Sequence, residues 1–275
     1  MREDIFRITG KEKGPTSIVL AGVHGNERSG IEALAALLPT LAIQAGELLI
    51  GYGNPRAIEA NQRLIETNLN RMFFQDSARP SKKERASYEY ERAQFLKPYL
   101  KEAGALLDVH ASRTPKSRPF SICEENAKDI IEYLPIDLVT TGFTVIEPGA
   151  TDGYMNTIGN IGICVEVGYF GDPASVQTAK ESIIAFLKAR GHIPNDRERT
   201  TQSTIHMNDI YITRTDAFVL TKMFDDFEEV AEGQLIGTDG DQEVRANKNA
   251  VIVFARNQNS IGEEAFILGE KKNPA

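Results

Sequence analysis

The sequence predicts an α/β protein, with a mostly parallel mixed sheet flanked by helices and a small all-β domain after it. Continuous apolar runs rich in β-branched residues, typical of buried parallel strands, alternate with segments of helical periodicity. A polar segment without apolar periodicity then covers residues 194–204, and short alternating strands follow it. We therefore expect a first domain over residues 1–195 and a second over 196–275.

The first domain alternates strands and helices along the chain. The apolar run over 17–23 predicts a buried strand, a polar turn HGNERSG follows, and IEALAALLPTL has helical periodicity. Gly191 suits the position just after the end of a helix. The remaining predicted strands cover 47–51, 105–109 and 162–167, and the remaining helices cover 83–103 and 174–190.

The second domain contains short strands separated by turn residues. Strands are predicted over 210–212, 218–224 and 250–255. Turn-forming residues lie between them at 238–241 and 247–249. The alternation without helical segments predicts an all-β unit.

The composition excludes several classes of protein. The chain of 275 residues has 31 Lys plus Arg and 39 Asp plus Glu, a net charge of −8, which argues against non-specific nucleic-acid binding. It has two cysteines, Cys123 and Cys164, too few for a disulfide framework or a cysteine-rich zinc site. The charged N-terminal segment and the absence of a long apolar run predict a cytoplasmic protein without membrane contact. Formation of a homo-oligomer is left open.

Two histidines and two carboxylates follow or end the predicted strands. His24 and Glu27 come after the first strand, His110 follows the strand over 105–109, and Glu166 lies near the end of 162–167. Ligands collect at the carboxyl ends of parallel strands, so these side chains are expected at one edge of the sheet. Two His and one Glu form a catalytic zinc set with an open position, and zinc lowers the pKa of a bound water to about 7. Glu166 would then be the general base.

Each of these residues has a simpler interpretation when taken alone. An isolated H-x-x-E pair is more often a surface pair, and His110 could be a strand-end histidine with ordinary partners. Glu166 is harder to explain this way, because a carboxylate between Val165 and Val167 is costly to bury unless it is paired or bound to metal. The conjunction of the four residues favours a metal site.

Arginines recur through residues 54–74. Arg56, Arg63 and Arg71 are seven to eight residues apart, and a guanidinium suits carboxylate recognition. From spacing alone, we interpret this segment as a solvated helix face whose arginines pair with Glu59 and Glu66.

The combined motifs resemble the succinylglutamate desuccinylase and aspartoacylase family, a branch of the zinc carboxypeptidase-like hydrolases. The resemblance lies in HGNE at 24–27, NPR at 54–56, NLNRMF ending at Phe73, DVH at 108–110 and VEVG at 165–168. It covers residues 15–190 in the family's order and near its spacing. The C-terminal β domain is also similar to the family's second domain, with weaker motifs.

The resemblance implies a role for each matching position. It implies one Zn²⁺ per chain, held by His24, Glu27 and His110, and Glu166 as the general base. Arg63 would polarise the scissile carbonyl and stabilise the oxyanion. The carboxylate of a small anionic, acyl-amino-acid-like substrate would be held by Asn70 and Arg71.

Two positions depart from the aspartoacylase pattern. The arginine that binds a second substrate carboxylate in those enzymes falls at or near Asn156 here. The tyrosine that assists substrate binding is missing from residues 255–266. A basic segment over 112–118 could compensate through Arg113, Lys116 or Arg118, and its alternative interpretation is a solvated loop.

The sequence therefore favours a zinc-dependent hydrolase that cleaves the amide bond of a small N-acyl amino acid. One alternative is a metallocarboxypeptidase that acts on a short peptide, since both enzymes use the same ligand set. The other is a zinc-retaining protein without catalysis, which would have no need for a base at Glu166.

Overall fold

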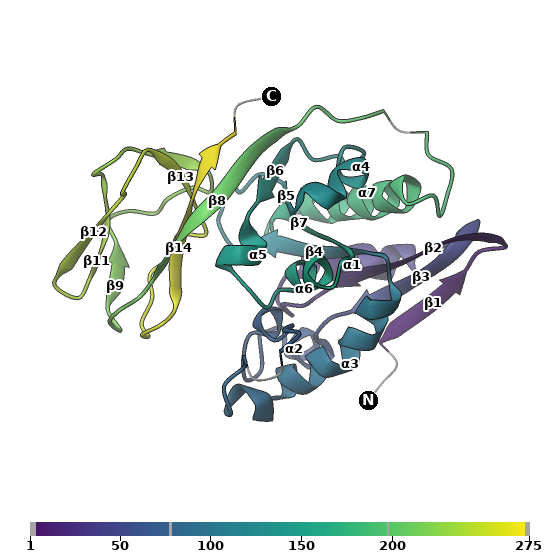
Figure 1. Ribbon diagram of the computed structural model, residues 1–275, viewed down its shortest axis with the longest axis horizontal. Coiled ribbons are helices and arrows are strands. Elements are labelled where there is room, and N and C mark those ends of the chain that lie inside the picture. The colour runs from purple at the N-terminus through teal and green to yellow at the C-terminus, as the bar shows by residue number, and fades with distance from the viewer. Residues whose placement is uncertain (1–3, 77–78, 197, 273–275) are drawn as a thin grey trace.

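The computed structural model describes residues 4–76, 79–196 and 198–272, and these residues form a long mixed sheet (Figure 1). Its first seven strands in spatial order are β1 (Ile5–Thr9), β3 (Ala45–Tyr52), β2 (Glu12–Ala21), β4 (Ala105–Ser112), β7 (Ile161–Tyr169), β5 (Phe120–Cys123) and β6 (Leu138–Thr141). The same sheet continues through β8 (Ser203–Ile212), β14 (Glu264–Lys271), β13 (Ala250–Val253) and β10 (Glu228–Val230).

The centre of the sheet is parallel. β3, β2, β4 and β7 run in one direction, while β1 and β5 pair antiparallel at its two sides. All eight residues of β4 are buried, because helices cover both faces of a parallel sheet. The apolar runs in the sequence therefore became central strands, and their carboxyl ends meet at one edge.

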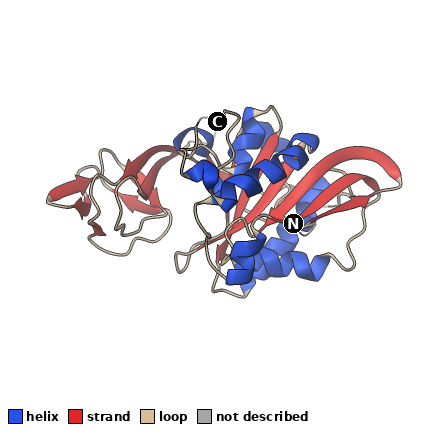
Figure 2. Ribbon diagram, turned by 90° about the horizontal axis from the view of Figure 1, so that it is seen from below, coloured by secondary structure: helices blue, strands red, loops and turns tan. Residues whose placement is uncertain are grey.

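Helices cover both faces of the sheet (Figure 2). The core on one face includes side chains from α1, α4 and α7, and the core on the other includes side chains from α3 and α6. The α-helices are α1 (Arg28–Leu37), α2 (Pro55–Ala60), α3 (Tyr88–Glu102), α4 (Lys128–Ile131), α5 (Phe143–Ile146), α6 (Thr151–Thr157) and α7 (Ala174–Ala189). Short 3₁₀ turns occur at η1 (Leu69–Arg71), η2 (Glu84–Ala86) and η3 (Glu125–Ala127). Among the described residues, no helix is long and apolar enough to cross a membrane.

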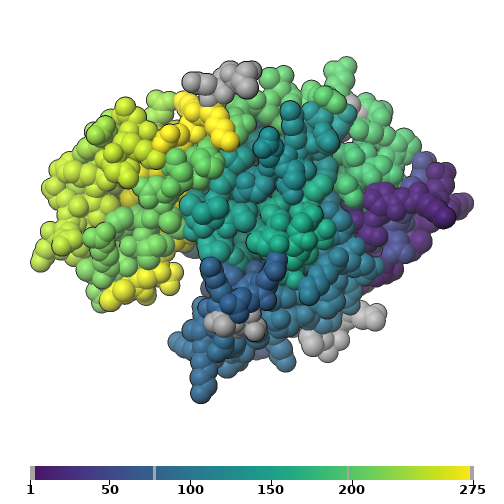
Figure 3. Space-filling view, viewed as in Figure 1, coloured from purple at the N-terminus to yellow at the C-terminus, as the bar shows by residue number. Residues whose placement is uncertain are grey.

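The C-terminal strands form a lobe beside the helical part of the molecule (Figure 3). β8 pairs parallel with β6 on one side and antiparallel with β14 on the other, so the lobe shares the central sheet. A second, three-stranded antiparallel sheet completes it, with β12 (Gln242–Arg245), β11 (Leu235–Asp239) and β9 (Phe218–Leu220).

The predicted fold class is confirmed, and the differences are local. Gly191 adopts φ +74° directly after α7 and its C-cap residue Arg190, as its position predicted. The polar segment over 194–204 is shorter than expected, because β8 begins at Ser203. β9 ends at Leu220 and not at residue 224. The ends of strands contain few residues of the alternating apolar pattern, so the sequence determines the first and last residue of a strand poorly.

The interpretation of residues 54–74 as one solvated helix face is wrong. α2 ends at Ala60, and Asn61 follows in the left-handed conformation with φ 50°. Apart from the single turn of η1, the residues from Asn61 to Phe74 are irregular. The arginines are thus placed by specific contacts and not by a helical repeat.

Candidate active site

His24 and Glu27 lie in the tight connection between β2 and α1. Gly22 has φ +69°, a left-handed conformation that glycine adopts without strain. A Cβ atom on Gly25 would lie 2.1 Å from the backbone carbon of Ala57, so only glycine lets the connection pass α2 so closely. The glycines of this segment therefore bend the chain so that His24 and Glu27 share one space.

His110 and Glu166 come from the two adjacent strands β4 and β7. They are register partners in the parallel pairing, which places the imidazole and the carboxylate side by side on the sheet. Glu166 is 8% exposed, and its Oε2 atom is buried without a hydrogen-bond partner among the described residues. An unpaired buried carboxylate oxygen is costly, so this position favours a role in binding or chemistry.

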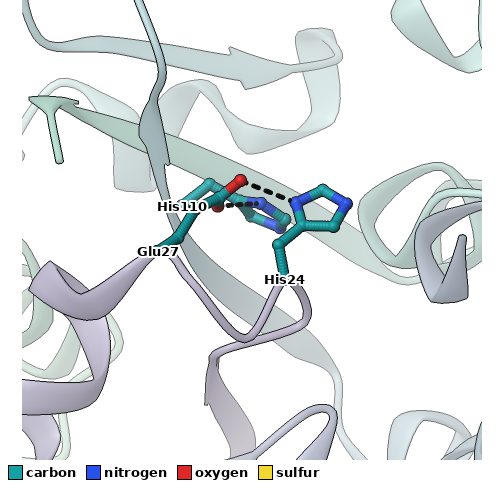
Figure 4. A group of neighbouring side chains, drawn as sticks. All are labelled: His24, Glu27 and His110. Atoms are coloured by element: carbon teal, nitrogen blue, oxygen red, sulfur yellow. Dashed lines mark hydrogen bonds and ion pairs between the residues drawn. The ribbon is translucent and has the colours of Figure 1, made fainter. Parts of the chain in front are cut away.

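His24, Glu27 and His110 converge on a single point (Figure 4). Their potential ligand atoms all lie within 4.8 Å of one another, and all three residues are buried. His24 Nδ1 lies 2.8 Å from Glu27 Oε1, and His110 Nδ1 lies 3.0 Å from Glu27 Oε2. The structure thus brings together the three residues that the sequence analysis expected at one edge of the sheet.

Two further residues fix the imidazole rings, and the sequence interpretation did not include them. Asn68 Oδ1 forms a hydrogen bond of 3.1 Å with His24 Nε2, and Asp108 Oδ2 lies 3.1 Å from His110 Nε2 as an ion-pair contact without hydrogen-bond geometry. Partners on Nε2 leave the Nδ1 lone pair of each ring for a cation, the usual arrangement around metal-binding histidines. Asp108 carried a signal, because an acidic residue inside the apolar run ALLDV resembles Glu166 in that respect.

Without a bound cation, the pKa values of the three candidate ligands show that the cluster favours a positive charge. Burial and the Arg63 guanidinium lower the pKa of His24 to about 4, so its imidazole is neutral at pH 7. Burial opposes the ionisation of Glu27, but the two histidines hold its pKa well below the ordinary value. Burial also opposes protonation of His110, but Asp108 and Glu27 raise its pKa well above the ordinary value. The negative charges of Glu27 and Asp108 therefore favour a positive charge at His110.

The residues fit a zinc ion. His24 Nδ1 is buried and, despite its short distance to Glu27, has no hydrogen bond of good geometry. Two imidazole nitrogens and one carboxylate on a buried, partly open site match the ligand types of catalytic zinc centres. The unpaired, buried Nδ1 atom of His24 and its place beside Glu27 and His110 are the observations that support this fit.

Arg63 is held against the same carboxylate. Its Nη1 donates to Glu27 Oε1 at 2.9 Å, and its backbone oxygen accepts from Gly25 N at 3.4 Å. The Arg63 side chain is 28% exposed, so it extends from the buried cluster toward solvent. This position places a fixed positive charge beside the three candidate ligands.

The loop that carries Arg63 and Asn68 is organised by a buried carboxylate, Glu89, from α3. Glu89 is fully buried and accepts hydrogen bonds from the backbone N–H groups of residues 65–67 at 2.7, 3.2 and 3.2 Å. Its Oε1 also accepts from Asn54 Nδ2 at 3.3 Å. A loop without regular structure is thus fixed by one side chain that satisfies three of its backbone donors.

Asn70 and Arg71 lie next to this loop. Asn70 Oδ1 accepts from the backbone N–H of Thr151 at 3.1 Å, and its own N–H donates to Asn68 Oδ1 at 3.0 Å. Arg71 forms ion pairs with Glu147 and with Glu264, the latter at 3.3 Å. Glu264 belongs to the C-terminal lobe, so Arg71 connects the two parts of the molecule.

The basic segment after His110 is on the surface. Arg118 pairs with Asp137 at 2.5 Å, and Arg113 and Lys116 are exposed. Within the described part of the chain, Arg113 has no hydrogen-bond or ion-pair partner. Asn156 accepts from the backbone N–H of Gly162 at 3.3 Å and thereby helps to fix the turn between α6 and β7.

Asp226 of the C-terminal lobe contacts the edge of the sheet that carries the candidate site. Its Oδ2 accepts from Ser112 Oγ at 2.9 Å, directly beyond His110 on β4. Burial, together with the charges of Glu27 and Asp226, raises the pKa of Glu166 to about 8. Both halves of the chain therefore shape the electrostatics of the candidate base.

Comparison with known proteins identifies the same part of the chain. Residues 13–189 match the model of the succinylglutamate desuccinylase/aspartoacylase catalytic domain. A succinylglutamate desuccinylase from Photorhabdus laumondii is 39% identical over 79 residues, and the match covers 26% of this chain and 24% of that relative. A succinylglutamate desuccinylase from Vibrio vulnificus is 25% identical over 282 residues, with 91% of this chain and 79% of the relative covered.

The fold is also found in a solved structure. The crystal structure of succinylglutamate desuccinylase from Vibrio cholerae is similar with a TM-score of 0.82 at 18% identity, covering 98% of this chain and 86% of that one. The matched domain includes the strand ends that carry His24, Glu27, His110 and Glu166. The chain therefore belongs to the succinylglutamate desuccinylase/aspartoacylase family.

Proposed function

We propose that the protein is a zinc-dependent hydrolase that cleaves the amide bond of a small N-acyl amino acid. The observation that carries this proposal is the position of Glu166 beside the three candidate ligands, with one buried carboxylate oxygen free. A purely structural metal site has no use for an unpaired buried carboxylate at this position.

His24, Glu27 and His110 would hold the ion through two Nδ1 atoms and one carboxylate. Asn68 and Asp108 would keep the rings in the required orientation through Nε2. When bound, zinc acts as a Lewis acid and lowers the pKa of a water in the site toward neutrality.

Glu166 would take the proton of the attacking water and later return it to the leaving amine. Its pKa of about 8 indicates a proton affinity near neutral pH, where one carboxyl group can both accept and donate a proton. Arg63 would hold the oxygen of the scissile carbonyl, because its fixed guanidinium can stabilise negative charge as it develops there. The products are a carboxylate and a free amine.

Asn70, Arg71 and Arg113 are proposed to line the side of the site that receives the amino-acid part of the substrate. Within the described residues, the Asn70 Nδ2 donor has no partner and is available to a substrate carboxylate. The exposed Arg113 follows the same strand as His110 and can attract an anion to the entrance.

The test is a substrate panel with zinc-loaded protein. N-succinylglutamate, N-acetylaspartate, several apolar N-acyl amino acids and short peptides would be assayed for release of a new primary amine. Glu166→Gln is the matched control, because it keeps the shape of the side chain and removes the base. We expect turnover of at least one acyl amino acid that the control loses while it retains zinc. Release of C-terminal residues from peptides alone would show a carboxypeptidase, and zinc binding without turnover would show a non-catalytic protein.

A further inference from the structure

Arg71 is already occupied by two carboxyl groups of the protein. Glu147 follows α5 in the helical part, and Glu264 begins β14 in the C-terminal lobe. Both contact Arg71 Nη2, Glu264 at 3.3 Å, and both side chains are only 11% exposed. Arg71 Nη1 donates to the Asn70 backbone oxygen at 2.8 Å, so both terminal nitrogens of the guanidinium are engaged.

The two carboxyl groups form a hydrogen-bonded pair. Burial and the neighbouring Glu264 raise the pKa of Glu147 well above its ordinary value, although Arg71 opposes this effect. Burial also opposes the ionisation of Glu264, but the hydrogen bond with Glu147 and the guanidiniums of Arg256 and Arg71 lower its pKa overall. The two carboxyl groups therefore share the negative charge that neutralises Arg71.

This pair lies at the substrate side of the catalytic centre. Arg71 is three residues from Asn68, which contacts His24, and Glu264 interacts electrostatically with Arg63. Asp226, from the same lobe, lies at Ser112 close to Glu166. The lobe thus contributes two carboxylates near the site, Asp226 and Glu264, and these carboxylates disfavour a further negative charge close to them.

We propose that Glu264, supported by Glu147, is a specificity-determining residue that selects acyl amino acids whose side chain carries no carboxylate. The inference rests on the proposed function. A dicarboxylic substrate that used Arg71 would compete with Glu264 for the guanidinium. Glu264 would keep its contact with Arg256 Nη2 at 3.5 Å and lose the pair with Arg71 at 3.3 Å, while a further negative charge entered the same buried cluster. A neutral or cationic side chain leaves the Arg71–Glu264 pair intact.

The test compares two substrates of nearly equal shape, N-acetylaspartate and N-acetylasparagine, with zinc-loaded protein. We expect the wild type to favour N-acetylasparagine in kcat/KM by about tenfold or more, because the two ligands differ in one negative charge. Glu264→Gln should raise kcat/KM for N-acetylaspartate by about tenfold, mainly through KM, and Glu147→Gln should act in the same direction. Glu263→Gln is the matched control, because Glu263 is an exposed neighbour on the same segment.

The outcomes separate this inference from the proposed function. If the wild type hydrolyses N-acetylaspartate better, or if Glu264→Gln leaves the ratio of the two substrates unchanged, the function stands and the inference is overturned. If neither substrate is hydrolysed and the wider panel is also inactive, the function fails, and calorimetric binding of the same two compounds decides the inference. A gain in affinity for N-acetylaspartate in Glu264→Gln then supports it, and equal or absent affinity in both proteins overturns it.

Discussion

Replacing Glu89 should loosen the loop that carries Arg63 and Asn68. Each oxygen of Glu89 accepts two hydrogen bonds, Oε1 from Ile65 N and Asn54 Nδ2, and Oε2 from two further backbone donors. In Glu89→Gln, one oxygen becomes an NH₂ group that faces two donors. Two lost bonds to a charged group are worth about 1.5–3 kcal/mol each, and partial exposure of the loop favours the lower figure, so we expect about 3 kcal/mol.

The lost hydrogen-bond energy should make local unfolding of this loop more favourable, and native-state proteolysis can measure that change. A loss of about 3 kcal/mol raises the open population roughly a hundredfold, so trypsin should cleave after Arg63 about a hundred times faster. Hydrolytic activity should fall with it, because Arg63 and Asn68 lose their fixed positions. Glu91→Gln is the matched control, since Glu91 is exposed on the same first turn of α3. Equal cleavage rates in the two variants would refute the assigned role of Glu89.

Three further predictions concern the catalytic cluster. Glu166→Gln should lower kcat by about 10²–10⁴-fold while zinc content, read by mass spectrometry, stays at one ion per chain; unchanged turnover would remove Glu166 from the mechanism. Asp108→Asn should weaken zinc affinity about 10–100-fold in chelator competition, because His110 loses the partner that orients its ring; unaltered affinity would contradict this role. In the metal-free protein, native Glu166 keeps its proton up to pH about 8, whereas the unfolded chain releases it near 4.5. Glu166 should therefore lower the free energy of unfolding as pH rises through this window, by up to about 1.4 kcal/mol per pH unit. Glu166→Gln should remove this part of the slope and leave the part that comes from Glu147 and His110.

Three of the four residues of the candidate site could be predicted because their positions follow from strand order. His24, His110 and Glu166 follow or end apolar runs, and the carboxyl ends of parallel strands must meet at one edge. Their convergence needs no knowledge of side-chain packing. The alternation of strands and helices predicted the fold class for the same reason.

Residues that act through long-range contacts were not predictable in this way. Glu89 reaches a loop more than twenty residues earlier, and Glu264 meets Arg71 across 193 positions of the chain. Neither contact leaves a periodic pattern, since both are determined by how the elements pack. The helical interpretation of residues 54–74 was wrong for a related reason, because contacts from Glu89 place that loop and no helical repeat does.

Because the C-terminal lobe shares the central sheet, it is held rigidly next to the candidate active site. β8 is held by backbone hydrogen bonds to β6 and β14, so swinging the lobe outward would require breaking a continuous ladder in the middle of the molecule. Removing the lobe would leave the full edge of β6 unpaired and ready to join another chain. Under the proposed function, the charges that the lobe contributes near the site are therefore fixed in place, and single substitutions on β14 should change substrate choice directly.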